Sequence, residues 1–128
     1  MSLRERHINA IRKKANRGFS GYPIATIAFY GPTDKIASKV TAAIILGEEQ
    51  DVAHLERWFS SGSDIRRDHH VMQHVIDFIR SHTAKSVLIT ENIIGCPHEE
   101  GVDYPEGATC PACPFWAGRN RWTGAIEH

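Results

Sequence analysis

The sequence lacks any long apolar run and any excess of charge of one sign. Its longest apolar runs, around residues 24–30 and 40–46, are far shorter than the roughly 20 residues that a membrane-spanning helix requires. Fifteen Lys and Arg balance fifteen Asp and Glu, so no basic field covers the whole molecule and any contact with nucleic acid has to be local. Residues 1–18 are basic and contain no apolar stretch of the kind found in a secretory signal, so we expect a cytoplasmic protein.

Cysteine is scarce, and all three cysteines lie in the last third of the chain. An odd number in so short a stretch argues against a disulfide framework and favours metal binding or redox chemistry. The sequence also lacks the phosphate-binding glycine loop, the dinucleotide fingerprint, the serine nucleophile elbow and the H-E-x-x-H zinc motif. With 128 residues, 41% of them apolar and 23% charged, the chain has the size and composition of one folded domain.

Apolar spacing predicts an α+β domain with a small mixed three-stranded sheet, a hairpin plus one strand, packed with two or three helices and a C-terminal zinc-binding loop. Alternation favours a strand at 24–30, and a β-branched run favours a second at 36–46, although the latter also fits a helix. The remaining expected elements are a basic helix over 3–16, a helix over 51–59, a helix over 69–82 that begins after Asp68, and a strand over 85–91.

This pattern divides the single domain into three parts. Residues 1–18 form the basic N-terminal helix, residues 22–91 the α/β core, and residues 95–128 the zinc loop with an aromatic tail. The loop therefore begins where the last expected strand ends.

Four side chains in this loop have the chemistry of a tetrahedral zinc site: Cys96, His98, Cys110 and Cys113. The C-x-x-C pair resembles one half of a zinc-ribbon or treble-clef site. The first half departs from that pattern, because one residue rather than two separates its ligands, so His70 or Asp103 remains an alternative fourth ligand. Four protein ligands leave no position for water or substrate, which is typical of a structural site.

Two further resemblances involve the same residues. Cys110-Pro111-Ala112-Cys113 resembles the C-P-x-C redox motif of glutaredoxin-like proteins, although no βα unit follows to lower the pKa of the first thiol. The sequence His98-Glu99-Glu100 followed by the C-x-x-C pair resembles the zinc nucleobase deaminases, which implies that Glu100 takes the place of the general acid/base. In that family strands separate the two motifs, and this chain has no room for them.

The sequence thus supports two functions. The first is a binding or regulatory module with a structural zinc site, for which the candidate contacts to nucleic acid or a protein partner are Arg12, Lys13, Lys14, Arg119, Arg121 and Trp122. The alternative is a small zinc-dependent hydrolase or deaminase-like enzyme with an open metal site and Glu99 or Glu100 as general acid/base. A second group, His70, His74 and Asp77, shares one helix face, where we expect solvent rather than metal.

Overall fold

The structure is a computed structural model that describes residues 19–60 and 62–119. The helix expected over 3–16 lies outside the described residues. No helix within the described ranges is long and apolar enough to cross a membrane.

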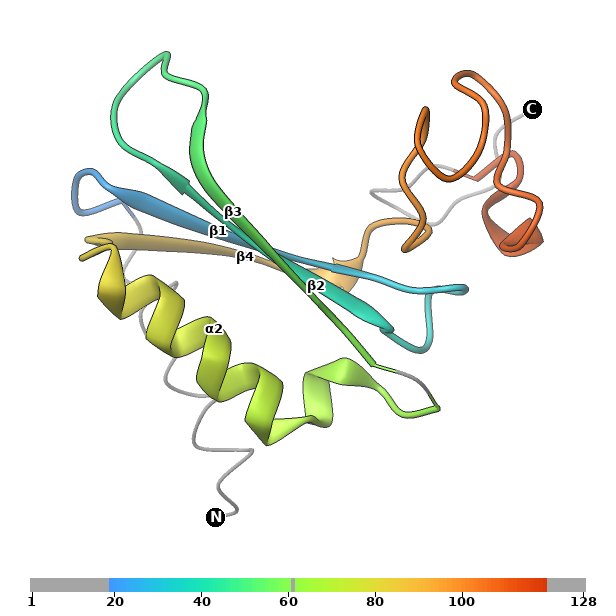
Figure 1. Ribbon diagram of the computed structural model, residues 1–128, viewed down its shortest axis with the longest axis horizontal. Coiled ribbons are helices and arrows are strands. Elements are labelled where there is room, and N and C mark those ends of the chain that lie inside the picture. Colours follow the sequence, from blue (N-terminus) through green and yellow to red (C-terminus); the bar gives the residue numbers. More distant parts are fainter. Residues whose placement is uncertain (1–18, 61, 120–128) are drawn as a thin grey trace.

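The described chain folds into a single four-stranded sheet and one α-helix (Figure 1). The strands lie in the order β3-β2-β1-β4. The pairs β1–β2 and β2–β3 are antiparallel, and β4 runs parallel to β1. The strand bounds are β1 Ile24–Tyr30, β2 Lys39–Ile45, β3 Val52–Phe59 and β4 Ser86–Ile93. The strand predictions at 24–30, 36–46 and 85–91 are therefore confirmed, as is the hairpin between the first two.

The prediction of a helix over 51–59 is wrong, because these residues form β3. The predicted sheet accordingly has one strand too few, and the described residues contain one α-helix, α2 (His69–Ser81), with two short 3-10 helices, η1 (Ile65–Arg67) and η2 (Pro114–Trp116). The physical reason is the turn between β2 and β3, where Gln50 N donates to Gly47 O (3.2 Å) and brings the two strands into register. Pairing with β2 overrides the helical spacing of the apolar residues.

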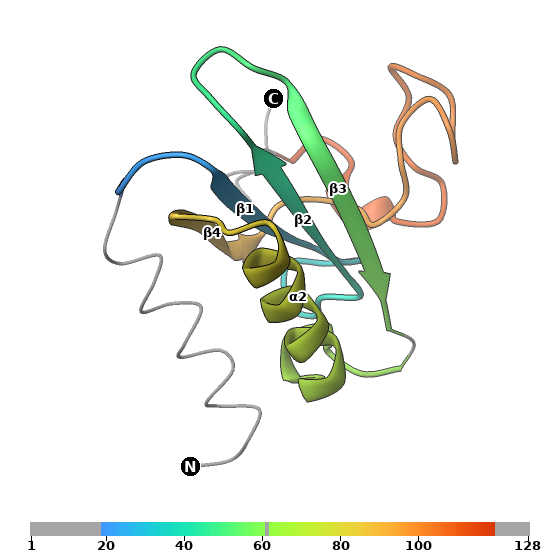
Figure 2. The ribbon, with the colours of Figure 1, turned by 60° about the vertical axis from the view of Figure 1, so that its left-hand side comes forward.

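The predicted helix over 69–82 is confirmed by α2. The Asp68 carboxylate accepts hydrogen bonds from His70 N (3.0 Å) and Val71 N (3.1 Å) and so caps its first turn. α2 crosses one face of the sheet (Figure 2). Its buried residues pack there against the inward-facing strand residues in one core: Met72, Val75, Ile76 and Ile79 against Ala25, Ile27, Phe29, Val40, Ala42, Ile44 and Val87.

No described helix covers the opposite face of the sheet. The register places Tyr30, Lys39 and Phe59 together on this face, where the chain enters β2 and leaves β1 and β3. The segment that follows β4 lies beyond the same end of the sheet (Figure 1). The cysteines therefore reach the sheet at one end, beside these three side chains.

Candidate metal centre

The pairing of β4 with β1 continues into the loop that carries the first candidate ligand. Ile94 N donates to Phe29 O (2.9 Å), and Gly31 N donates to Gly95 O (2.8 Å). These bonds fix the backbone directly before Cys96. The first half of the site is thus attached to the end of β1, a central strand of the sheet.

The second half is a tight turn. Cys113 N donates to Cys110 O (3.2 Å), which closes the C-x-x-C turn, and η2 begins immediately afterwards with Pro114. Both thiols are buried, with Cys113 only 1% exposed. The two sulfurs therefore face the interior of the loop rather than solvent.

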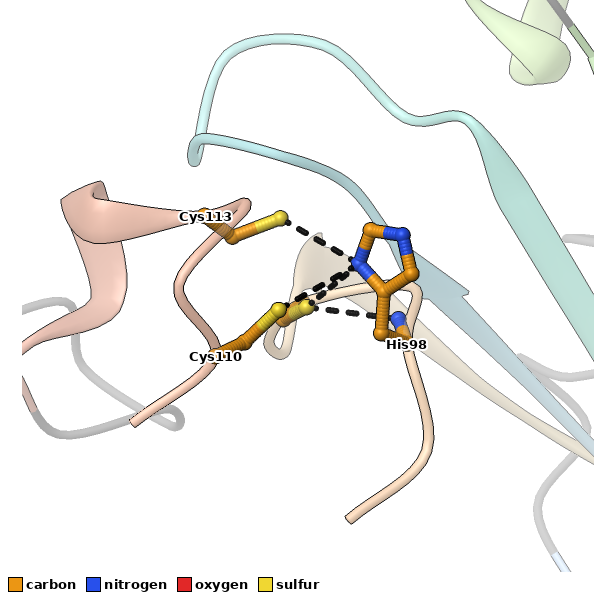
Figure 3. A group of neighbouring side chains, drawn as sticks. His98, Cys110 and Cys113 are labelled. Carbon is orange, nitrogen blue, oxygen red and sulfur yellow. Dashed lines mark hydrogen bonds between the residues drawn. The ribbon is translucent and has the colours of Figure 1, made fainter. Parts of the chain in front are cut away.

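The four predicted donor atoms lie within 4.8 Å of one another. His98 Nδ1 lies at the centre of the contacts, 3.2 Å from Cys96 Sγ and 3.5 Å from both Cys110 Sγ and Cys113 Sγ. Figure 3 shows this ring nitrogen directed at the sulfurs while the other ring nitrogen points away. Sequence reasoning had identified all four donors, and the structure brings them together.

These distances match the edges of a coordination tetrahedron. Zinc–sulfur bonds of about 2.3 Å and a zinc–nitrogen bond of about 2.0–2.1 Å, at the tetrahedral angle, place each sulfur about 3.5 Å from the nitrogen. The three sulfur–nitrogen distances of 3.2, 3.5 and 3.5 Å are close to that value. The arrangement therefore leaves room for one ion among the four side chains.

Without a cation, the protein environment disfavours the charged form of two of the thiols, Cys96 and Cys113. Burial, together with the neighbouring Cys113 and Cys110 thiols, raises the pKa of Cys96 to about 12, against a hydrogen bond from His98 N that lowers it. Burial also raises the pKa of Cys113 above its usual value. A bound dication reverses this preference because it attracts thiolates. A metal bound by this cluster would therefore displace protons from the thiols.

A buried lysine and an arginine fasten the loop to the open sheet face. Lys39 is 4% exposed, and its Nζ donates to Pro97 O (3.1 Å) and Glu99 Oε1 (3.4 Å). The same ammonium lies over the rings of Tyr30 (5.4 Å) and Phe59 (5.6 Å). Since Pro97 separates two of the donors, Lys39 holds the first half of the site against β2.

Glu99 accepts hydrogen bonds from both cations that attach the loop to the sheet. Arg57 Nε on β3 also donates to its carboxylate. Burial alone would raise the pKa of Glu99, but the hydrogen bonds and positive charges of Arg57 and Lys39 outweigh it and lower the pKa below its usual value. Glu99 is therefore an anion that links two strands to the loop.

The second half of the site is anchored through a tryptophan. Trp116 Nε1 donates to Gly31 O (2.8 Å), and the Trp116 ring packs against the hydrophobic core. Gly31 thus binds both halves of the site, one through its N–H and the other through its carbonyl. A Cβ at this position would lie 1.8 Å from Ile36 O, so only glycine fits.

The alternative ligands do not join the cluster. Asp103 Oδ2 accepts from Glu99 N (2.7 Å), and His70 lies at the start of α2, with its ring against that of His69. Asp77 accepts from Gln73 Nε2 (2.8 Å). Among the residues that the structure describes, the Cys₃His set is the only group of three or more such side chains close enough to hold an ion.

The candidate catalytic carboxylates have other partners. The Glu99 carboxylate is bound by Lys39 and Arg57, and Glu100 Oε1 accepts from Gly107 N (2.9 Å). Both side chains therefore stabilise the loop between the two halves of the site.

Of the six candidate partner contacts, only Arg119 belongs to the described residues. Its guanidinium lies over the Phe115 ring (4.1 Å). Arg12, Lys13, Lys14, Arg121 and Trp122 lie outside the described residues. Their role stays a prediction.

The aromatic residues after the last ligand were expected to pack the loop against the sheet, and Trp116 does so. Sequence reasoning missed its hydrogen bond to Gly31 and the other two residues that attach the loop, Lys39 and Arg57. The one available signal for such an attachment was Lys39. It is a charged residue at the start of a β-branched run, and the residues that follow it lie in the core. Its partner Glu99 lies 60 residues away, and no local pattern connects the two.

Comparison with known proteins adds no assignment. No family model, no curated protein and no solved structure matches this chain. The functional argument therefore rests on the chemistry of the site and its surroundings.

Proposed function

We propose that this chain is a protein-interaction module in which a structural zinc ion, held by Cys96, His98, Cys110 and Cys113, orders the C-terminal loop. The observation that carries the proposal is the convergence of four donor atoms within 4.8 Å. Three thiolates and an imidazole in tetrahedral arrangement suit zinc better than the hard cations calcium and magnesium.

The structural role follows from the number of protein donors. Four donors complete a tetrahedral shell, so no coordination position is left for water or a substrate. The carboxylates of Glu99 and Glu100 are engaged in holding the loop. No observation in the described chain favours the hydrolase or deaminase-like alternative over this role.

In this proposal the ion orders a segment that has no regular secondary structure. The segment from Cys96 to Thr109 has no helix or strand, and its own hydrogen bonds are local turns. Such a segment gains little from burial of apolar groups, so cross-linking its two ends through a metal supplies order that the chain alone does not.

The charge of the loop favours a protein partner over nucleic acid. Residues 96–119 contain the acids Glu99, Glu100, Asp103 and Glu106 and a single cationic side chain, Arg119. A dication bound by three thiolates adds a further negative charge. Such a surface repels a phosphate backbone.

A cleft of about 720 Å³ between the loop and the open sheet face offers a contact surface. Phe59 on β3 and Val102 in the loop both line it and are 64% and 76% exposed. Exposed apolar side chains beside polar groups are typical of protein contact sites. We therefore place the partner surface at this cleft.

The metal part of the proposal is tested by zinc analysis of protein purified without added zinc. We expect one zinc per chain, with loss of the ion in Cys113→Ser and retention in Thr109→Ser, a matched change beside a ligand. Limited proteolysis between residues 97 and 112 is expected to speed up when a chelator removes the ion. Zinc well below one equivalent in the unaltered protein contradicts the proposal.

The partner class is tested separately, on immobilised single- and double-stranded nucleic acid. We expect the zinc-loaded full-length chain to pass through without retention at low salt, where phosphate contacts are strongest. Retention that falls steeply with salt would overturn the assignment to a protein partner and favour the nucleic-acid module, while leaving the zinc assignment intact.

A further inference from the structure

The outer edge of β3 is open. β3 is the edge strand of the order β3-β2-β1-β4 and lies at one side of the sheet in Figure 2. No segment within residues 19–60 and 62–119 pairs with this edge. All residues of the strand except Trp58 are exposed. An edge of this kind presents a row of backbone donors and acceptors to any strand that approaches it.

β3 has two charged side chains, Glu56 and Arg57, and one register shift, but otherwise lacks the features that protect natural edge strands. It has eight residues, contains neither Lys nor Pro, and carries three exposed large apolar side chains, Val52 (51%), Leu55 (42%) and Phe59 (64%). Its one irregularity is a register shift at Ala53, since Ile44 pairs with His54 while Ile45 pairs with Val52. The regular, accessible part of the edge therefore begins at His54.

A second copy of β3 is a strand whose side chains fit this edge. When a two-fold axis stands perpendicular to a shared sheet, one residue lies opposite its own copy and the residues on either side lie opposite each other. Centring the pair on Glu56 or Arg57 sets like charges face to face, which is destabilising. Centring it on Leu55 sets an apolar pair in the middle.

We propose that two copies of this chain associate through antiparallel pairing of their β3 edges, centred on Leu55. His54 then lies opposite Glu56 of the second copy, and the symmetry repeats this contact. An imidazole has an N–H to donate to a carboxylate in both its neutral and its protonated form. The regular residues His54, Leu55 and Glu56 of the two copies pair in this register, and the two sheets lie edge to edge with their uncovered faces side by side.

The other edge of the sheet fits a second copy less well. The pairing of β4 with β1 shifts register between Ile27 and Phe29, so the β4 backbone is irregular in its second half. β3 also carries His54 and Glu56, which face each other between the copies in one register, so it is the edge we assign to the interface. This inference uses no metal ligand and stands independently of the zinc proposal.

The test is sedimentation velocity of the zinc-loaded full-length chain over a dilution series. We expect a concentration-dependent dimer. His54→Glu places carboxylates opposite each other at both symmetric contacts and is expected to raise the dimer dissociation constant about tenfold or more. The same charge change at His74, on the exposed side of α2, is the matched control and is expected to leave the constant unchanged.

The double variant His54→Glu with Glu56→His tests the register itself. It exchanges the two side chains, restores the pairing across the axis, and is expected to return the dissociation constant to near its original value. His54 also stacks on His82 of its own chain (4.2 Å between ring centroids), and the single and double variants lose that contact equally. Recovery in the double variant therefore reports the contact between copies.

Three results would overturn the proposal. These are a monomer at every concentration, an effect of His54→Glu no larger than that of the His74 control, and a double variant as weakly associated as the single one.

Discussion

Replacing Trp116 by Phe tests how the second half of the metal site is held to the sheet. The substitution keeps an aromatic ring against the core but removes the N–H that donates to Gly31 O at 2.8 Å. Gly31 is buried, so its carbonyl loses a partner that water does not readily replace. An unsatisfied buried acceptor costs about 1–3 kcal/mol.

Trp58→Phe is the matched control for this prediction. Trp58 is also half-buried and packs edge-on against Phe78 (6.0 Å), and the structure shows no hydrogen bond from its indole to a described residue. The two variants lose a similar amount of aromatic surface. The difference between them therefore measures the hydrogen bond.

The assay is urea unfolding of the zinc-loaded proteins, followed by far-ultraviolet circular dichroism because the variants differ in tryptophan content. We expect Trp116→Phe to lower the free energy of unfolding by about 1–3 kcal/mol more than Trp58→Phe. Equal losses in the two variants would refute the idea that this bond anchors the loop.

Three smaller changes test other parts of the structure. Gly31→Ala is expected to cost about 3 kcal/mol or more in urea unfolding because its new Cβ meets a backbone carbonyl at 1.8 Å, whereas Gly47→Ala, whose Cβ meets only a flexible side chain, is expected to cost less than 1 kcal/mol; equal costs would contradict the close approach. Asp68→Ala removes the cap of α2 and is expected to lower the free energy of unfolding by about 1 kcal/mol, with Asp68→Asn close to the original protein, and thermal melts check both. Burial raises the pKa of Asp64, but hydrogen bonds and the charge of a neighbouring arginine outweigh it and lower the pKa below 3.8, so its stabilising contribution is present above that value and is lost as the pH falls through the folded pKa. The stability difference between the original protein and Asp64→Asn is therefore expected at neutral pH and to vanish in acid; a difference that grows in acid would contradict this sign.

The elements that sequence reasoning predicted correctly are those with local signals. Asp68 caps α2 by bonding to backbone groups two and three residues ahead, and the apolar face of α2 repeats within the helix itself. The four candidate metal ligands could be predicted equally well, because Cys96, His98, Cys110 and Cys113 lie within one short stretch of sequence. Each of these features depends on neighbours along the chain.

The features that sequence reasoning missed depend on contacts between distant segments. The sequence of β3 predicted a helix because its apolar residues fit the period of a helix as well as that of a strand. Only pairing with β2 decides between the two. Glu99 meets Arg57 and Lys39 across 42 and 60 residues, and Trp116 meets Gly31 across 85. The register of the sheet determines which of these distant residues come into contact, and no local pattern in the sequence encodes that register.

The central claim, that this loop is organised by one structural zinc ion, is tested most directly by zinc K-edge X-ray absorption of the purified protein, with the zinc content measured on the same sample. The account predicts one zinc per chain, with three sulfurs at about 2.3 Å and one nitrogen at about 2.0–2.1 Å. A shell that contains fewer than three sulfurs together with a water oxygen would contradict the structural assignment, as would zinc well below one equivalent.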